Sequence, residues 1–173
     1  MLSIRLATHA DSDIIANLHA QSWLNTYRGI VPDHFLDNDL HAERKKYWEK
    51  KMKDLKHNEF VFLAEDGGEA VGFAAVLDKP EADCDAFIDN LHVRTDMKGK
   101  GIGKSLMRAV AERLRATNRH SVYLWVLHGN VAAEKFYYAV GAQSADTTTA
   151  KFGDLDVVQK RFVWTTLEPL LKK

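Results

Sequence analysis

The sequence feature that most constrains the fold is a glycine-rich stretch at residues 98–105, KGKGIGKS, between a segment of strand character and a segment of helix character. Glycines permit positive φ angles and let a ligand approach the backbone. Successive N–H groups at the start of a helix bind anions, and the helix dipole adds to this attraction. The stretch therefore predicts a strand–loop–helix unit that binds phosphate. A tight turn with solvent-facing lysines is the alternative interpretation.

Two nucleotide-binding patterns fail here by one position each. The Walker A pattern G-x-x-x-x-G-K-[ST] fits Gly103, Lys104 and Ser105, but Lys98 stands where the first glycine belongs. The dinucleotide pattern G-x-G-x-x-G begins at Gly99, but Lys104 takes the place of its third glycine. Neither ATP nor NAD is favoured, and a small ATP- or GTP-dependent enzyme stays an alternative.

Length and composition restrict the class of protein. The chain has 173 residues, 46% of them hydrophobic, which predicts one globular domain over residues 1–173. Its 24 basic and 24 acidic residues balance, which argues against nucleic-acid and membrane partners. A single cysteine, Cys84, forms neither an internal disulfide nor a zinc cluster. No apolar run approaches the roughly 18 residues of a membrane span, and a cytoplasmic location is expected.

Hydrophobic periodicity predicts an α/β (α+β) chain with the element order β-α-α-β-β-β-α-β-α-β-β. The segment 121–127 is an almost continuous apolar run, typical of a strand covered on both faces. The last two strands form a hairpin with its turn at Gly153 and Asp154. The expected elements are strands 3–6, 60–65, 70–77, 84–93 and 121–127, helices 14–27, 43–55, 102–116 and 131–140, and the final hairpin 147–167.

Two motifs resemble a known family. Residues 91–107, LHVRTDMKGKGIGKSLM, resemble the acetyl-CoA signature of the GNAT superfamily of N-acetyltransferases, with Lys98 in place of the usual Gln or Arg. Residues 130–142, NVAAEKFYYAVGA, resemble its second signature, although Ala142 replaces the usual aromatic residue. The strand and first helix at residues 4–23 are also similar. The resemblance implies the GNAT acyl-CoA N-acyltransferase fold, a central mixed, mostly antiparallel sheet flanked by helices.

The same resemblance implies acetyl-CoA as co-substrate and no metal. The backbone of Leu91, His92 and Val93 would bind the pantetheine arm, and Asn130 and Tyr137 would line its other side. The pyrophosphate would lie on the glycine-rich stretch, whose expected cofactor-binding residues are Lys98, Gly99, Lys100, Gly101, Ile102, Gly103, Lys104 and Ser105.

Catalytic roles follow from the resemblance and from side-chain chemistry. Tyr137 matches the tyrosine that protonates the departing thiolate in many relatives, and a tyrosine with a pKa of ~10 holds its proton at neutral pH. Helical spacing alone would make it a packing residue. Phe87 stands near the position where many relatives carry a glutamate base, and Asp85 and Asp89 lie two residues away on the same face by alternation. Asp89 is therefore the first candidate base and His92 the second, although both suit an ordinary strand edge, and some relatives need no dedicated base.

The acceptor is expected to be a primary amine of a small molecule or peptide, acetylated by direct transfer in a ternary complex. A non-catalytic acyl-CoA-binding regulatory module is the alternative, and a homodimer stays open. Trp23 and Tyr27 are interpreted as packing residues, and Cys84 as a buried thiol. The acidic stretch at residues 78–89 is interpreted as a solvated loop and strand edge.

Overall fold

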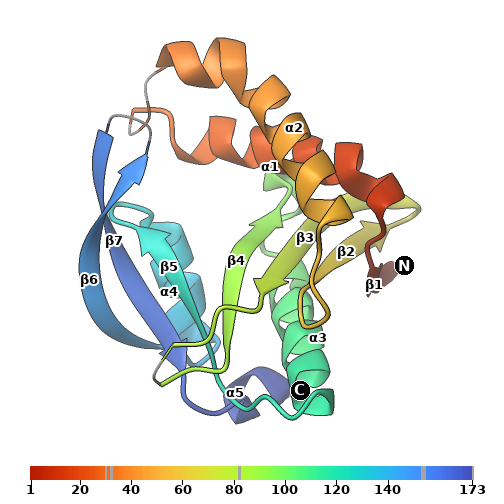
Figure 1. Cartoon of the computed structure of the whole chain (residues 1–173), viewed down its shortest axis with the longest axis vertical. Helices are drawn as coiled ribbons and strands as arrows, with labels where there is room; N and C mark the ends of the chain where they lie inside the picture. Colours follow the sequence, from red (N-terminus) through yellow and green to blue (C-terminus); the bar gives the residue numbers. More distant parts are fainter. Residues whose placement is uncertain (30, 32, 82, 153–154, 173) are drawn as a thin grey trace. The chain divides into compact units, whose positions relative to one another are not determined.

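The computed structural model describes residues 1–29, 31, 33–81, 83–152 and 155–172 (Figure 1). Seven strands form one mixed sheet in the order β1-β2-β3-β4-β5-β7-β6. The strands are β1 Leu2–Leu6, β2 Phe60–Asp66, β3 Glu69–Leu77, β4 Ala86–Val93, β5 Val122–Leu127, β6 Gln143–Phe152 and β7 Leu155–Trp164. The helices are α1 Ser12–Thr26, α2 Leu40–Lys53, α3 Ile102–Ala116, α4 Val131–Ala139 and α5 Glu168–Leu171.

The expected element order is confirmed, and the differences lie where apolar periodicity is weak. Strand β6, QSADTTTAKF, begins at Gln143, before the expected start of the hairpin at residue 147, because pairing with β7 stabilises a strand that lacks apolar alternation. A π-helix at Phe35–Asp39 and the short helix α5 were not expected. The expected hairpin turn at Gly153 and Asp154 lies outside the described residues.

By its internal contacts the chain divides into two compact units. Unit 1 comprises Met1–Ala75 and Asn90–Ala109, and unit 2 comprises Val76–Asp89 and Val110–Lys173. Strands β3 and β4 and helix α3 each contribute residues to both units.

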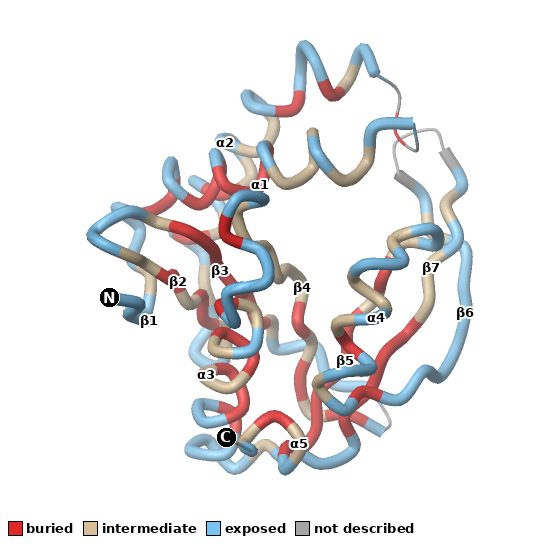
Figure 2. The backbone as a smooth tube through the Cα atoms, turned by 180° about the vertical axis from the view of Figure 1, so that it is seen from behind, coloured by how far each residue is buried: buried red, intermediate tan, exposed pale blue. Residues whose placement is uncertain are grey.

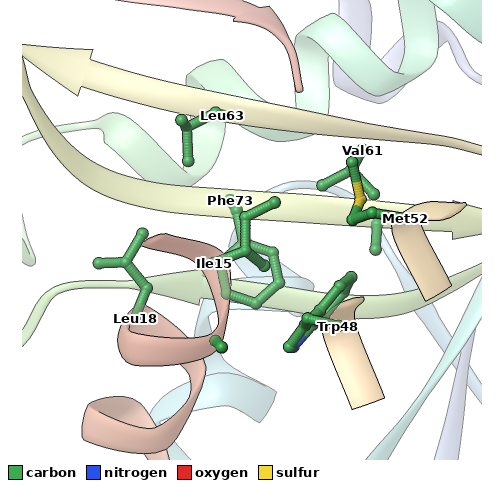
Figure 3. Packing of buried hydrophobic residues seen from close by; sticks show 9 residues of the cluster. Ile15, Leu18, Trp48, Met52, Val61, Leu63 and Phe73 are labelled. Carbon is green, nitrogen blue, oxygen red and sulfur yellow. The ribbon is translucent and has the colours of Figure 1, made fainter. Parts of the chain in front are cut away.

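The core of unit 1 lies where α1 and α2 pack on β2 and β3 (Figure 3). Trp48 and Phe73 are fully buried with their rings 5.3 Å apart and edge-on. Burying a large apolar side chain contributes about 1.5–3 kcal/mol, so this cluster fixes both helices on the sheet. Buried positions run along β3 (Figure 2). The labelled members of the cluster are Ile15, Leu18, Trp48, Met52, Val61, Leu63 and Phe73.

An ion pair fixes the entry into α1. Asp11 accepts two hydrogen bonds from the Arg5 guanidinium, at 2.9 and 2.8 Å, and one from the Thr8 N–H at 2.7 Å. These bonds, led by those from Arg5, lower the pKa of Asp11 to about 2. A carboxylate before the first turn of a helix also interacts favourably with its dipole.

Unit 2 contains β5 between β4 and β7, with buried residues along β5 and at the C-terminal end of β7 (Figure 2). β5 pairs parallel with β4 through Ala86–Val122 and Phe87–Tyr123, and antiparallel with β7. Tyr123 is fully buried, as the apolar run of the sequence predicts.

Unit 2 contains an ion-pair cluster in which the buried Arg161 pairs with the more exposed carboxylates of Glu81, Asp83 and Asp146. The Arg161 side chain is 4% exposed and binds Asp83 through two hydrogen bonds, at 2.9 and 2.7 Å. It also pairs with Glu81 at 2.8 Å and lies over the Tyr123 ring at 4.5 Å. Glu81 and Asp83 are 36% and 51% exposed, in agreement with a solvated loop, and they also pair with Arg161, a partner that sequence separation hid.

Candidate functional site

The glycine-rich loop of unit 1 has the backbone that its sequence predicts. Gly99 and Gly101 have φ angles of 79° and 80°, in the left-handed region that other residues avoid. A Cβ atom at either position would meet no protein atom within 4 Å. Backbone conformation, rather than lack of space, therefore requires glycine at both positions.

The loop leads directly into the N-terminus of α3. The first bond of this helix runs from the Ser105 N–H to the Gly101 carbonyl, at 3.0 Å. The N–H groups of Ile102, Gly103 and Lys104 precede that bond and so lack an intrahelical acceptor. Together with the dipole of a 15-residue helix, these donors suit an anion. The Ser105 hydroxyl instead donates to the Gly101 carbonyl at 3.1 Å, which stabilises the turn.

The end of β4 lies tightly against β3. The Arg94 N–H donates to the Val71 carbonyl at 2.8 Å. A Cβ atom on Gly72 would lie 2.7 Å from the His92 carbonyl oxygen, closer than such atoms approach. Glycine at 72 therefore permits the close packing that fixes the backbone of Leu91, His92 and Val93.

His92 belongs to a cluster of imidazoles and polar groups that the sequence did not reveal. The Ser22 hydroxyl lies 2.8 Å from His92 Nδ1, and the His92 ring lies 4.6 Å from that of His19. The Trp48 indole N–H donates to His19 Nδ1 at 2.9 Å. No sequence motif links these residues, although His19 follows the buried face of α1, four residues after Ile15.

Both imidazoles are held in the neutral form. Burial lowers the pKa of His92 to about 3, and the charges of Lys98 and Arg44 lower it further. Burial also lowers the pKa of His19, with smaller contributions from His92 and Arg44. Unit 1 thus holds two uncharged imidazoles at neutral pH.

A pocket of about 420 Å³ adjoins this cluster within unit 1. Ser22 lines it and connects it to His92. Asn25 is fixed at its rim, because its amide donates to the Gln21 carbonyl at 3.0 Å and to the Thr95 hydroxyl at 3.2 Å. The pocket is lined by Leu18, Gln21, Ser22, Asn25, Arg94, Thr95 and Asp96.

Asn130 and Tyr137 lie on α4 in unit 2. The Asn130 side chain caps the helix by accepting a hydrogen bond from the Ala133 N–H at 3.2 Å. Tyr137 is 7% exposed, and its ring packs 5.7 Å from Phe162 and 5.9 Å from Trp164. Both residues thus have a structural role in this unit, and their functional roles stay predictions.

Phe87, Asp85 and Asp89, near the start of β4, bear on which residue could act as the general base. Phe87 stacks on Tyr123 with ring centroids 4.9 Å apart. The Asp85 carboxylate accepts hydrogen bonds from the N–H groups of His120, at 2.7 Å, and Ser121, at 3.2 Å. These bonds lower the pKa of Asp85. They also join the segment before β4 to the segment before β5. Asp89 is half-buried on β4, and its role as a base stays a prediction.

Other expectations concern packing. Cys84 is buried, and burial, with the nearby Asp83 charge, raises the pKa of its thiol to about 11, which agrees with a plain buried thiol. Trp23 contacts His19 and Tyr27 edge-on at 5.3 Å each, as packing residues do. Among the described residues, no cluster of three or more metal-ligating side chains occurs. None of the described helices is long and apolar enough to cross a membrane.

Comparisons with known proteins identify the family. Residues 20–142 match the model of the acetyltransferase (GNAT) family. An uncharacterized N-acetyltransferase from Bacillus subtilis is 25% identical over 98% of this chain and 96% of its own. Another from Archaeoglobus fulgidus is 30% identical over 79% of this chain and 89% of its own.

Solved structures show the same fold. The PaiA N-acetyltransferase from Thermoplasma acidophilum, in complex with coenzyme A, has a TM-score of 0.74 at 20% identity, covering 92% of this chain and 98% of its own. A putative acetyltransferase from Salmonella typhimurium, solved with its cofactor acetyl-CoA, has a TM-score of 0.69 at 20% identity, covering 96% and 94%.

The chain belongs to the acetyltransferase (GNAT) family. The resemblance, the fold class and the assignment as an acyltransferase made from the sequence are therefore confirmed.

Proposed function

We propose that the protein is an acetyl-CoA-dependent N-acetyltransferase that acetylates a primary amine by direct transfer in a ternary complex. The observation that carries the proposal is the loop at residues 98–105, where two left-handed glycines precede the N-terminus of α3. Family membership and relatives solved with coenzyme A or acetyl-CoA support the same ligand.

The proposed cofactor contacts come from the loop and from the end of β4. The N–H groups of residues 99–104 suit a pyrophosphate, and Lys98, Lys100 and Lys104 supply compensating charge. The backbone of Leu91, His92 and Val93 would hold the pantetheine arm, as the family resemblance implies. The co-substrate supplies an activated acetyl thioester, and the protein supplies alignment, which contributes up to ~7–11 kcal/mol in well-oriented pairs.

Tyr137 is the proposed general acid for the departing thiolate. It matches the family position, and its ring is held by Phe162 and Trp164. The Val93 N–H is the proposed donor to the thioester carbonyl oxygen. Such donors are worth roughly 10²–10³ in rate.

Two other parts of the proposal rest on the sequence. The balanced charge argues against nucleic-acid and membrane partners. A cytoplasmic location is proposed on the expectation drawn from the apolar pattern of the sequence. A regulatory module that binds acyl-CoA without catalysis would match the same loop, but it would need no tyrosine at position 137. A homodimer remains compatible with the proposal.

The test of catalysis is thiol release from acetyl-CoA with a panel of primary amines, comparing two adjacent tyrosine variants. Tyr137→Phe keeps the ring packing and removes the hydroxyl, so kcat should fall about 10²-fold with the KM for acetyl-CoA unchanged. Tyr138 is 46% exposed, and Tyr138→Phe should keep the wild-type kcat. An unchanged kcat in Tyr137→Phe would remove Tyr137 from this role, and no turnover with any amine would favour the regulatory module.

A further inference from the structure

The reaction needs a route for the acceptor's proton. Asp85 already accepts two backbone hydrogen bonds, and Phe87, which stands near the position of the family's usual base, cannot take up a proton. Asp89 stays a proposed base. In unit 1, by contrast, a pocket, a hydroxyl and a neutral imidazole adjoin one another. This juxtaposition rests on contacts within a single unit.

The pocket and the imidazole are connected by one side chain. Ser22 lines the pocket, and its Oγ lies 2.8 Å from His92 Nδ1, within ordinary hydrogen-bond distance. The backbone of His92 is fixed by the close approach of β3 at Gly72. The His92 imidazole is therefore held where it can accept a proton, through Ser22, from a ligand that contacts the Ser22 hydroxyl.

The chemistry of the surroundings keeps the imidazole uncharged. An indole N–H is only a donor, so the bond from Trp48 makes His19 Nδ1 an acceptor and places the His19 proton on Nε2. His19 is 1% exposed, and within the described chain its Nε2 has no hydrogen-bond partner. The charged groups that act on His92 are the cations Lys98 and Arg44, which oppose its protonation in the resting protein.

We propose that the pocket lined by Ser22 receives the acceptor amine and that Ser22 and His92 form the path by which the amine loses its proton. This inference rests on the proposed function. Ser22 would contact the amine, His92 would accept the proton through Ser22, and His19 would position the His92 ring.

The proton leaves the amine during its attack on the acetyl thioester. The amine nitrogen forms a bond to the thioester carbonyl carbon and becomes cationic, which makes its N–H groups far more acidic. One proton passes from nitrogen to Ser22 Oγ while the Ser22 proton passes to His92 Nδ1. The carbon–sulfur bond breaks, and the thiolate takes the proton of Tyr137. The imidazolium then returns its proton to water, and the Tyr137 phenolate takes a proton back from water, which restores both groups.

The kinetic experiment compares variants that separate proton transfer from structure, using an amine that the wild-type enzyme acetylates. Ser22→Ala should lower kcat about 10²-fold with little change in the KM for acetyl-CoA, whereas Ser22→Thr keeps a hydroxyl and should retain most of the activity. His92→Asn keeps an acceptor for Ser22 but cannot take the proton, so its kcat should fall as far. Ser3→Ala, an exposed serine of the same unit, is the matched control.

A wild-type kcat in Ser22→Ala or in His92→Asn would overturn the inference while leaving the acetyltransferase assignment intact. A failure of the wild type to acetylate any amine would instead overturn the proposed function. Thermal unfolding of each variant shows whether a loss of activity reflects a loss of structure.

A spectroscopic test needs no activity. Long-range ¹H–¹⁵N correlations of the free protein at neutral pH should show His92 neutral, with an unprotonated Nδ1 and a protonated Nε2. In Ser22→Ala the Nδ1 resonance should shift, because its donor is gone. A proton on Nδ1, or an imidazolium, would overturn the inference, because Ser22 could then not donate its proton to that nitrogen.

Discussion

The two units solve the burial of polar groups in opposite ways. In unit 1 the buried polar cluster is neutral, because His19 and His92 are uncharged and are joined to Trp48 and Ser22 by single hydrogen bonds. In unit 2 it is ionic, because the guanidinium of Arg161 pairs with the carboxylates of Glu81, Asp83 and Asp146. The proposed proton path lies in the neutral cluster.

The difference follows from the cost of desolvating charge. A buried ion pair repays that cost only when every partner is in place, so it resists any change of protonation or position. A neutral imidazole held by one hydrogen bond can accept a proton without breaking other contacts. The ionic cluster therefore suits a fixed structural centre, and the neutral cluster suits chemistry.

The largest expected loss of stability comes from removing the carboxylates that pair with Arg161. Its side chain is 4% exposed, whereas those of Asp83 and Glu81 are 51% and 36% exposed. Replacing both acids by alanine leaves the buried guanidinium with only the exposed Asp146, 3.7 Å away, among its ion-pair partners in the described part of the chain, and should cost about 3–5 kcal/mol of unfolding free energy. Arg161→Met leaves carboxylates that water can reach and should cost less.

Equilibrium unfolding in urea measures the loss of unfolding free energy in each variant. A shift of the urea midpoint with an unchanged m-value gives that loss. Equal costs for the two variants would mean that the cluster acts as a simple salt bridge, and the contrast between the units would lose its basis.

A smaller effect is expected in unit 1 at Gly72. Alanine there would place Cβ 2.7 Å from the His92 carbonyl oxygen, a backbone atom that cannot move independently. Overpacking of this kind typically costs about 1–3 kcal/mol, so Gly72→Ala should unfold at lower urea. It should also change the His92 resonances. Wild-type stability with unshifted resonances would show that β3 and β4 do not fix the imidazole.

A third effect appears only at acid pH and concerns the pH dependence of stability. The pKa of His92 is depressed in the folded state, so the unfolded chain binds the extra proton as pH falls from about 6.5 towards 3. The contribution of His92 is thus complete above pH ~6.5 and is lost below it, with a slope of at most ~1.4 kcal/mol per pH unit.

His92→Asn should flatten the fall of stability between about pH 6.5 and 4. His57→Asn, at an exposed position, is the control and should leave the curve unchanged. The measurement is the urea midpoint of the wild type and of both variants across this pH range. A curve for His92→Asn that parallels the wild type would mean that the imidazole is not held neutral.

The parts that could be predicted from sequence are those with local signals. The conformation of the loop depends on its own glycines, at positions 99 and 101, and that of α3 on its own apolar periodicity. The loop and the helix could therefore be predicted at their observed positions. Apolar alternation also located β2 and β3 closely.

The parts that could not be predicted depend on contacts between distant segments. Arg161 lies 78 residues from Asp83, and Ser22 lies 70 residues from His92, so no spacing rule connects either pair. The sequence also cannot show that the Asp85 carboxylate is already bound by the N–H groups of residues 120 and 121.

The most direct test of the central claim is isothermal titration of the purified protein with acetyl-CoA, ATP and NAD in separate experiments. We expect saturable one-site binding of acetyl-CoA and no measurable binding of ATP or NAD at the same concentrations. Binding of ATP or NAD without binding of acetyl-CoA would contradict this expectation, because the loop at residues 98–105 would then hold a nucleotide and the proposed transfer would have no acetyl donor.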